Sequence, residues 1–210
     1  MIPLLFATRN PGKLAELRRL VAGLPLRVLS PDDVGRPLPE VEEDAATFAG
    51  NAEKKAAACA RAAGIHALAD DSGIGIDALY GLPGIRSARW SEPEAPGLSG
   101  RERDEANNAK LLRALDGVEG ALRGAEYKAV LVLAAPDGAI LATVAGTCRG
   151  RIAEARRGTG GFGYDPLFVP DEHPDRTMAE LSPGEKDAIS HRGRAFREVL
   201  PHLRRLAATL

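Results

Sequence analysis

The chain has 210 residues, of which 44% are hydrophobic and 27% charged, an ordinary balance for a globular protein that buries its own core. Its 28 basic and 29 acidic residues give a formal net charge of −1. That balance argues against a dedicated nucleic-acid binder, because such proteins carry a basic face. The apolar runs are far shorter than the roughly 20 residues of a membrane helix, so we expect neither a membrane association nor a nucleic-acid partner.

The two cysteines, Cys59 and Cys148, lie far apart in the sequence. They offer neither the spacing of zinc ligands nor a disulfide framework. The first residues lack the basic start and long apolar stretch of a signal peptide. We therefore expect a cytoplasmic protein whose thiols are reduced and buried.

Hydrophobic periodicity and turn signals predict alternating strands and helices. The expected strands span residues 2–7, 26–29, 66–69, 127–135 and 139–144. The expected helices start at Pro11, span 51–63 and 101–115, start at Pro183 in a capping box, and start after Ser190. Pro136-Asp137-Gly138 predicts a hairpin turn between the last two strands. Because helices alternate with strands early and a hairpin comes later, the pattern favours a mixed α/β sheet.

A polar turn, Thr8 to Lys13, follows the first strand. It lies between a strand end and a helix N-terminus, where backbone N–H groups attract anions, and Lys13 adds a positive charge. This turn is a candidate phosphate cradle. The alternative is an ordinary polar loop in which Asn10 serves only as the helix cap.

Two acidic clusters could combine into a metal site. Glu42 and Glu43 lie in a loop, and Asp70 and Asp71 come just past a predicted strand. Neighbours along a strand point to opposite faces, so only one aspartate is expected to enter a given cleft. One carboxylate from each cluster would suit Mg²⁺, which takes one or two carboxylates plus substrate phosphates. The alternative is that the glutamates are solvated and Asp70 caps a turn.

Asn51 and Lys55 are one helical turn apart and therefore share a face of the Ala-rich helix. They could direct an amide and an ammonium group at one phosphate. The alternative for Lys55 is an ordinary surface lysine.

The glycine-rich stretch 158–165 formally fits a dinucleotide fingerprint. A dinucleotide fingerprint must follow a strand and open a helix, and residues 158–165 are predicted to do neither. A nicotinamide-dependent oxidoreductase is therefore disfavoured. A better interpretation is a loop that carries Phe162 and Tyr164, whose rings could stack on a nucleobase. The alternative is that both rings fill the core.

Lys186 and Ser190-His191-Arg192 lie near the C-terminus. If Ser190 caps the last helix, His191 and Arg192 occupy its first positions. Their donors and the helix dipole would then face an electronegative atom such as a base carbonyl or a phosphate oxygen. The alternative is a His-Arg pair on the surface.

Taken in order, these segments resemble the RdgB/Ham1 (inosine triphosphatase) family of noncanonical purine nucleoside triphosphate pyrophosphatases. The matching segments are Thr8–Lys13, Glu42-Glu43 with Thr47-Phe48 and Asn51–Ala56, Ala69–Gly73, Leu82-Pro83-Gly84 with Ser87–Trp90, Gly161–Pro166, and Glu185-Lys186 through Ser190-His191-Arg192. They run from the first strand to the last helix, so the resemblance covers nearly the whole chain.

The resemblance implies hydrolysis of ITP, dITP and XTP to the monophosphate and pyrophosphate, which keeps deaminated purines out of nucleic acids. It implies Mg²⁺ dependence, a homodimer, and one domain over residues 1–210 built as an elongated mixed β-sheet flanked by helices, with two intertwined lobes and a central active-site cleft. Alternatives are a house-cleaning pyrophosphatase with another nucleoside triphosphate preference, and a nucleotide-binding regulatory module without catalysis.

The resemblance also implies roles for individual residues. Asp71 would activate water and bind the metal with Glu42, or with its neighbour Glu43, and Lys55 would assist catalysis. The implied triphosphate contacts are Thr8, Arg9, Asn10, Pro11, Gly12, Lys13, Asn51 and Ser72. The implied base contacts are Phe162, Gly163, Tyr164, Asp165, Lys186, His191 and Arg192.

Overall fold

The computed structural model describes residues 1–208. The chain forms two compact units. The first unit contains residues 1–71, 129–146 and the chain from His191 onward, and the second contains residues 72–128 and 147–190.

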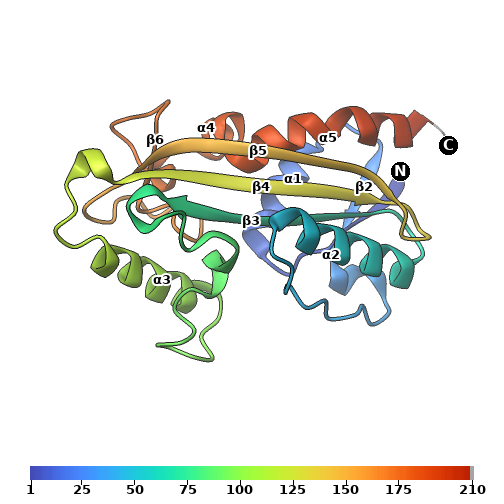
Figure 1. Cartoon of the computed structure of the whole chain (residues 1–210). Helices are drawn as coiled ribbons and strands as arrows, with labels where there is room; N and C mark the ends of the chain where they lie inside the picture. Colours follow the sequence, from blue (N-terminus) through green and yellow to red (C-terminus); the bar gives the residue numbers. More distant parts are fainter. Residues whose placement is uncertain (209–210) are drawn as a thin grey trace. The chain divides into compact units, whose positions relative to one another are not determined.

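The strands form one mixed sheet in the order β2-β1-β3-β4-β5-β6 (Figure 1). Their bounds are β1 (Ile2–Phe6), β2 (Leu26–Leu29), β3 (Ala67–Ile76), β4 (Gly124–Ala134), β5 (Ile140–Ile152) and β6 (Phe168–Pro170). Strand β1 pairs in parallel with β2 and β3, and β5 pairs antiparallel with β6. The predicted α/β class with a mixed sheet is therefore confirmed.

The α-helices are α1 (Pro11–Leu20), α2 (Phe48–Ala63), α3 (Gly100–Ala114), α4 (Pro183–Ile189) and α5 (His191–Ala208). Short 3-10 helices span Pro31–Val34, Asp77–Leu79, Gly84–Arg89, Gly120–Leu122 and Met178–Glu180. None of the helices within residues 1–208 has both the length and the apolar character needed to cross a membrane.

Local capping explains where several helices begin and end. Asn10 caps α1, its Oδ1 accepting from the Lys13 N–H at 3.0 Å. Ser182 and Glu185 form the predicted capping box of α4, and Gly64 ends α2 with a φ of +68°, in the left-handed region that glycine tolerates. Helix α2 begins three residues before the predicted start, because Thr47 caps it.

Strand β3 is longer than predicted and includes Asp70, Asp71 and Ser72. The prediction that the strand ends before the aspartates was wrong. Asp, Ser and Gly are depleted in strands and frequent in turns, so local preference indicated a turn. The pairing of β3 with its neighbours overrides that preference.

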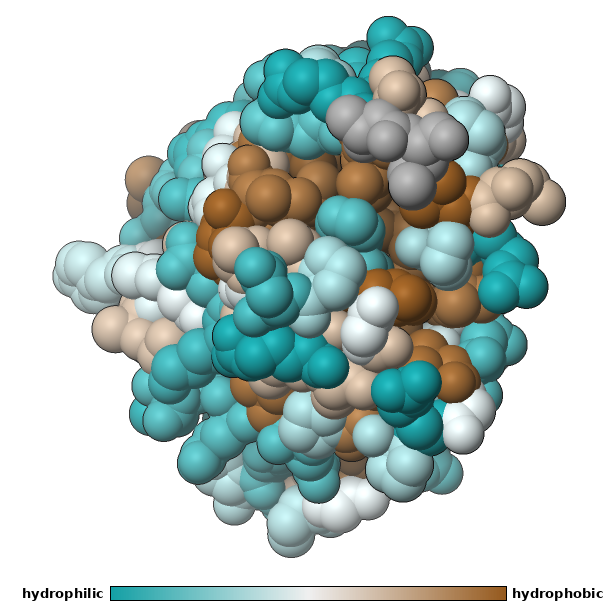
Figure 2. Space-filling model, turned by 90° about the vertical axis from the view of Figure 1, so that its right-hand side faces the viewer, coloured by the Kyte–Doolittle hydropathy of each residue, from teal (hydrophilic) through white to brown (hydrophobic). Residues whose placement is uncertain are grey.

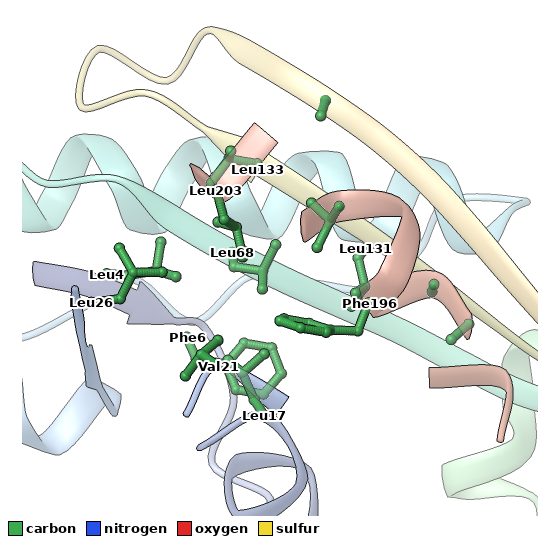
Figure 3. Close-up of a cluster of buried hydrophobic side chains, with 14 residues drawn as sticks. Leu4, Phe6, Leu17, Val21, Leu26, Leu68, Leu131, Leu133, Phe196 and Leu203 are labelled. Atoms are coloured by element: carbon green, nitrogen blue, oxygen red, sulfur yellow. The ribbon is translucent and has the colours of Figure 1, made fainter. Parts of the chain in front are cut away.

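The sheet of the first unit is covered on both faces, as the alternation of side chains along its strands requires. One core cluster contains Leu4 and Phe6 of β1 with residues of α1 and α5, and Figure 3 shows Phe196 of α5 directed into it. The other contains Leu5 of β1 with alanines of α2. Helices α1 and α5 therefore pack on one face and α2 on the other.

The second unit has its own core, to which the end of β3, α3, β4, β5, β6 and the segment after β6 contribute. The edge of the Tyr127 ring packs against Phe168, with ring centroids 4.8 Å apart. Hydrophobic side chains also reach the surface. Figure 2 shows brown areas between teal side chains on one face of the molecule, and Tyr80 and Leu82 of the second unit are 100% and 55% exposed.

Gly146 of β5 allows the first turn of α5 to approach the sheet. A Cβ at this position would lie 2.3 Å from both the His191 carbonyl oxygen and the Ala195 nitrogen. Real Cβ atoms do not approach backbone atoms this closely, so a larger residue here must displace the start of α5, which carries His191 and Arg192.

We predict that Gly146→Ala lowers the free energy of unfolding by about 1–3 kcal/mol, the usual cost of overpacking. Urea denaturation measures this difference. Gly184→Ala is the matched control, because nothing lies within 4 Å of its added Cβ and alanine is favoured over glycine in a helix by about 1 kcal/mol. Equal stability of the Gly146→Ala variant and the parent chain would contradict the prediction.

Candidate active site

Asp70 and Asp71, which are neighbours in β3, lie on opposite faces of the sheet. Leu68 lies in the core cluster with α1 and α5, and Ala69 lies in the cluster with α2. Continuing this alternation along the strand places Asp70 on the side of α1 and α5 and Asp71 on the side of α2. The expectation that only one aspartate enters a given site agrees with this arrangement.

Asp71 is held by α2. Asn51 is buried, and its Nδ2 donates to Asp71 Oδ2 at 3.0 Å. The Oδ1 atom of the same amide accepts from the Ala45 N–H at 2.9 Å. One side chain therefore orients the carboxylate and also holds the loop that precedes α2.

Lys55, one turn further along α2, forms an ion pair with Glu43, and its Nζ lies 3.4 Å from the Asp70 carbonyl oxygen. Burial raises the pKa of Asp71, the hydrogen bond from Asn51 lowers it, and the negative charge of Glu43 raises it again. The structure thus brings Asp71, Asn51, Lys55 and Glu43 together.

The acidic residue near Asp71 is Glu43, whereas the sequence favoured Glu42. Glu42 is exposed, and Glu43 is partly buried beside Lys55. Which of the two glutamates binds a metal stays a prediction, and the contact with Lys55 favours Glu43. The sequence left Glu43 as the alternative, because nothing in a loop fixes which of two adjacent side chains turns inward.

The carboxylates of Asp71 and Glu43 have the chemistry that a divalent cation requires. A buried carboxylate whose pKa is raised by a second acid would be stabilised by a cation between them. Within residues 1–208 no group of three or more His, Cys, Asp or Glu side chains is suitably placed to hold a metal ion. A pair of acids suits Mg²⁺, which is commonly bound by one or two carboxylates together with substrate phosphates.

On the other face, Asp70 is the centre of a buried ion network. Its carboxylate pairs with Lys13 of α1 and accepts from Arg192 Nε at 2.8 Å. Burial by itself would raise the pKa of Asp70, but the charges of Arg192 and Lys13 outweigh burial and hold that pKa well below its ordinary value. Arg192 Nη1 also donates to Glu16 at 2.6 Å. The network joins α1, β3 and α5.

This network differs from the base-side role that the sequence indicated for Arg192. The guanidinium is 3% exposed and contacts two carboxylates of the same unit. Glu16 was missed by the sequence analysis. Its position three residues after Lys13 on the same helix face, beside the buried Leu17, was the available signal.

The turn after β1 uses its own side chains to shape the backbone. Thr8 Oγ1 accepts from the Asn10 N–H at 3.2 Å, and Asn10 caps α1. Arg9 and Pro11 are exposed, while Gly12 and Lys13 are partly buried. The turn therefore presents the N-terminus of α1 and the Lys13 ammonium next to Asp70.

In the second unit, the glycine-rich loop brings Phe162, Asp165 and Lys186 together. Lys186 Nζ donates to Asp165 Oδ2 at 2.6 Å and lies 4.6 Å from the centroid of the Phe162 ring. The same Asp165 oxygen accepts from the Phe162 N–H at 2.8 Å. Phe162 remains partly accessible, whereas Lys186 and Asp165 are buried.

Tyr164 belongs to the core rather than to a stacking surface. Its ring lies in the hydrophobic cluster of the second unit, and its hydroxyl donates to the Ser87 carbonyl at 2.9 Å. Of the two aromatic residues of the loop, only Phe162 is available to a ligand. The segment 158–165 opens no helix, so the dinucleotide interpretation fails, as expected.

The remaining predicted residues lie next to these groups in the chain. His191 is buried at the first position of α5, directly before Arg192, and Gly163 lies between Phe162 and Tyr164. Ser72 follows Asp71 in β3 and is partly accessible.

We predict that Asp70→Asn lowers the free energy of unfolding by about 3–5 kcal/mol, because it leaves buried cations without their partner. Asp44→Asn is the control, since its pair with Lys54 is roughly half exposed and such surface pairs contribute at most about 1 kcal/mol. Chemical denaturation of both variants checks the difference. Similar losses in the two variants would contradict a central role for Asp70.

Known proteins resemble this chain in sequence and in fold. The profile of the Ham1 family matches residues 4–202. A dITP/XTP pyrophosphatase of Anaeromyxobacter sp. (strain Fw109-5) is 62% identical over 224 residues, covering 97% of this chain and 97% of that protein. The structure of a HAM1 protein from Coxiella burnetii is 36% identical, with a TM-score of 0.81, and the match covers 98% of this chain and 100% of that one. The chain therefore belongs to the Ham1 family.

Proposed function

We propose that the protein hydrolyses deaminated purine nucleoside triphosphates, namely ITP, dITP and XTP, to the nucleoside monophosphate and pyrophosphate. The observation that carries the proposal is the grouping of Asp71, Glu43, Asn51 and Lys55, together with the charge of Lys13 at the start of α1, which is near enough to lower the pKa of Asp71. The proposal is supported by the Anaeromyxobacter relative, which is named a dITP/XTP pyrophosphatase.

The first unit supplies the phosphate contacts. A triphosphate carries about four negative charges, and the N–H groups at the start of α1, with Lys13 and Lys55, offer positive potential to anions. Thr8 and Asn10 add polar groups at this turn. Ser72, which follows Asp71 in β3, is a further proposed phosphate contact. Asn51 fixes the Asp71 carboxylate, so the acid stays oriented when the phosphates arrive.

Asp71 and Glu43 would hold Mg²⁺. When bound, the ion supplies positive charge against the phosphate oxygens. The attacking water gives its proton to the Asp71 carboxylate as its oxygen bonds to the α-phosphorus. The bond from that phosphorus to the bridging oxygen breaks, and pyrophosphate leaves. Lys55 and Lys13 stabilise the charge that develops, because positioning and charge supply most of the catalysis in phosphoryl transfer.

We propose base contacts by Phe162, Asp165 and Lys186, which lie together in the second unit. A base contact by His191 is a separate proposal that the resemblance implies. The Phe162 ring offers a stacking surface, and Lys186 and His191 offer donors. A 6-oxo purine presents an acceptor where adenine presents a donor, so a site lined by donors pairs with the first and leaves groups unpaired with the second. That difference favours ITP and XTP over ATP.

A regulatory module without catalysis would not need the acid pair of Asp71 and Glu43, so we favour the enzyme. A pyrophosphatase with another triphosphate preference is the nearer alternative. We also propose a homodimer, which the resemblance to the Ham1 family implies. A cytoplasmic location is favoured by Cys59 and Cys148, whose buried thiols form no disulfide within residues 1–208.

We expect the protein to release pyrophosphate from ITP, dITP and XTP in the presence of Mg²⁺, and to release far less from ATP. The measurement is a pyrophosphate assay over a panel of purine and pyrimidine triphosphates with and without Mg²⁺. Preferential hydrolysis of a pyrimidine triphosphate would favour the alternative preference. Release of orthophosphate in place of pyrophosphate would contradict the proposed bond cleavage.

We expect Asp71→Asn to lower turnover at least ~100-fold, as for loss of a general base, with the thermal midpoint retained. Glu43→Gln and Glu42→Gln form a matched pair. The first should require more Mg²⁺ for half-maximal rate, and the second should behave like the parent chain, because only Glu43 lies beside Lys55. A reversed order of the two variants would restore Glu42 as the metal ligand.

A further inference from the structure

The polar helix α3, to which the proposed mechanism assigns no role, holds the backbone of the aromatic loop. Asp104 Oδ2 accepts from the Gly163 N–H at 2.8 Å, and Asn108 Nδ2 donates to the Gly163 carbonyl at 2.8 Å. The two side chains lie one helical turn apart and therefore face the loop together. Both backbone polar groups of one glycine are bound by one helix.

Gly163 is a sensitive point of this loop. Its φ is +62°, in the left-handed region, and nothing lies within 4 Å of the position of a Cβ. Glycine tolerates this conformation, and the two hydrogen bonds from α3 hold its backbone in place. Gly163 lies between Phe162 and Asp165 in the chain. Asp165 Oδ2 accepts hydrogen bonds from both the Phe162 N–H and Lys186 Nζ.

Burying the polar side chains of Asp104 and Asn108 beside the loop costs free energy of desolvation. Burial raises the pKa of Asp104, and the hydrogen bond from Gly163 acts against burial. Asn108 is 1% exposed, and its Oδ1 has no hydrogen-bond partner among the residues that the structure describes. The Asn108 amide uses its donors on the Asp104 and Gly163 carbonyls, at 2.9 and 2.8 Å, and leaves its acceptor unused. Its contacts are therefore directed at the backbone of the loop and of its own helix.

We propose that Asp104 and Asn108 are positioning residues. They hold the backbone of Gly163 and thereby keep the Phe162 ring and the Asp165–Lys186 pair where they can contact the base. This inference rests on the proposed function, because it takes those three residues as the base contacts. A role confined to stability would instead affect every ligand alike.

The test separates base binding from phosphate binding. Calorimetry without metal measures the affinity of Asp104→Ala, Asp104→Asn and Asn108→Leu for inosine monophosphate and for inorganic triphosphate. Asp104→Ala removes the acceptor of the Gly163 N–H, whereas Asp104→Asn retains an amide oxygen as acceptor. Glu102→Ala is the control, because Glu102 is exposed on the same helix.

We expect Asp104→Ala and Asn108→Leu to weaken inosine monophosphate binding about tenfold, the size expected for an unpaired buried backbone group. Triphosphate affinity should stay within about twofold, and Asp104→Asn should recover most of the loss. In turnover assays, the KM for ITP should rise while kcat changes little.

Unchanged inosine monophosphate affinity in Asn108→Leu, or parallel losses for both ligands in any folded variant, would overturn the positioning role. If Asp104→Ala does not fold, the affinities of Asp104→Asn and Asn108→Leu for inosine monophosphate and for inorganic triphosphate are compared in its place. A parent chain that releases no pyrophosphate from any triphosphate would instead overturn the proposed function, and the inference with it.

Discussion

The buried pairing of Asp70 with Lys13 and Arg192 underlies the arrangement of the first unit. Buried charges are stable only when their partners and hydrogen bonds are complete. The partners of Asp70 are Lys13 of α1 and Arg192 of α5, two helices at opposite ends of the chain. Glu16 accepts a further hydrogen bond from the Arg192 guanidinium. The network therefore fixes where the N-terminus of α1 and the first turn of α5 lie on the sheet.

Because side chains alternate along β3, the neighbouring residues Asp70 and Asp71 lie in different environments on opposite faces of the sheet. Asp70 lies among cations and keeps its charge, while Asp71 lies beside Asn51 and near another acid. The first stabilises the scaffold, and the second has the environment that a reactive carboxylate needs. A shift of one residue in the register of β3 would exchange the two environments.

Local signals in the sequence were sufficient for much of the fold and part of the site. Asn10 with Pro11 and the Ser182 capping box predicted helix starts correctly, because capping depends on a few adjacent residues. The length of β3, the choice of Glu43 and the partners of Arg192 were not predictable in this way. They depend on strand pairing, on loop conformation and on contacts across 122 residues of sequence.

The division of the chain into interleaved segments affects the order in which the protein can form during synthesis. The second unit ends at Ser190, whereas the first unit lacks α5 until residues after His191 have been made. Chains emerge from the ribosome N-terminus first. The first unit, although it begins with the first strand, is thus the last to be completed. A nascent chain halted before α5 leaves Asp70 without the Arg192 guanidinium.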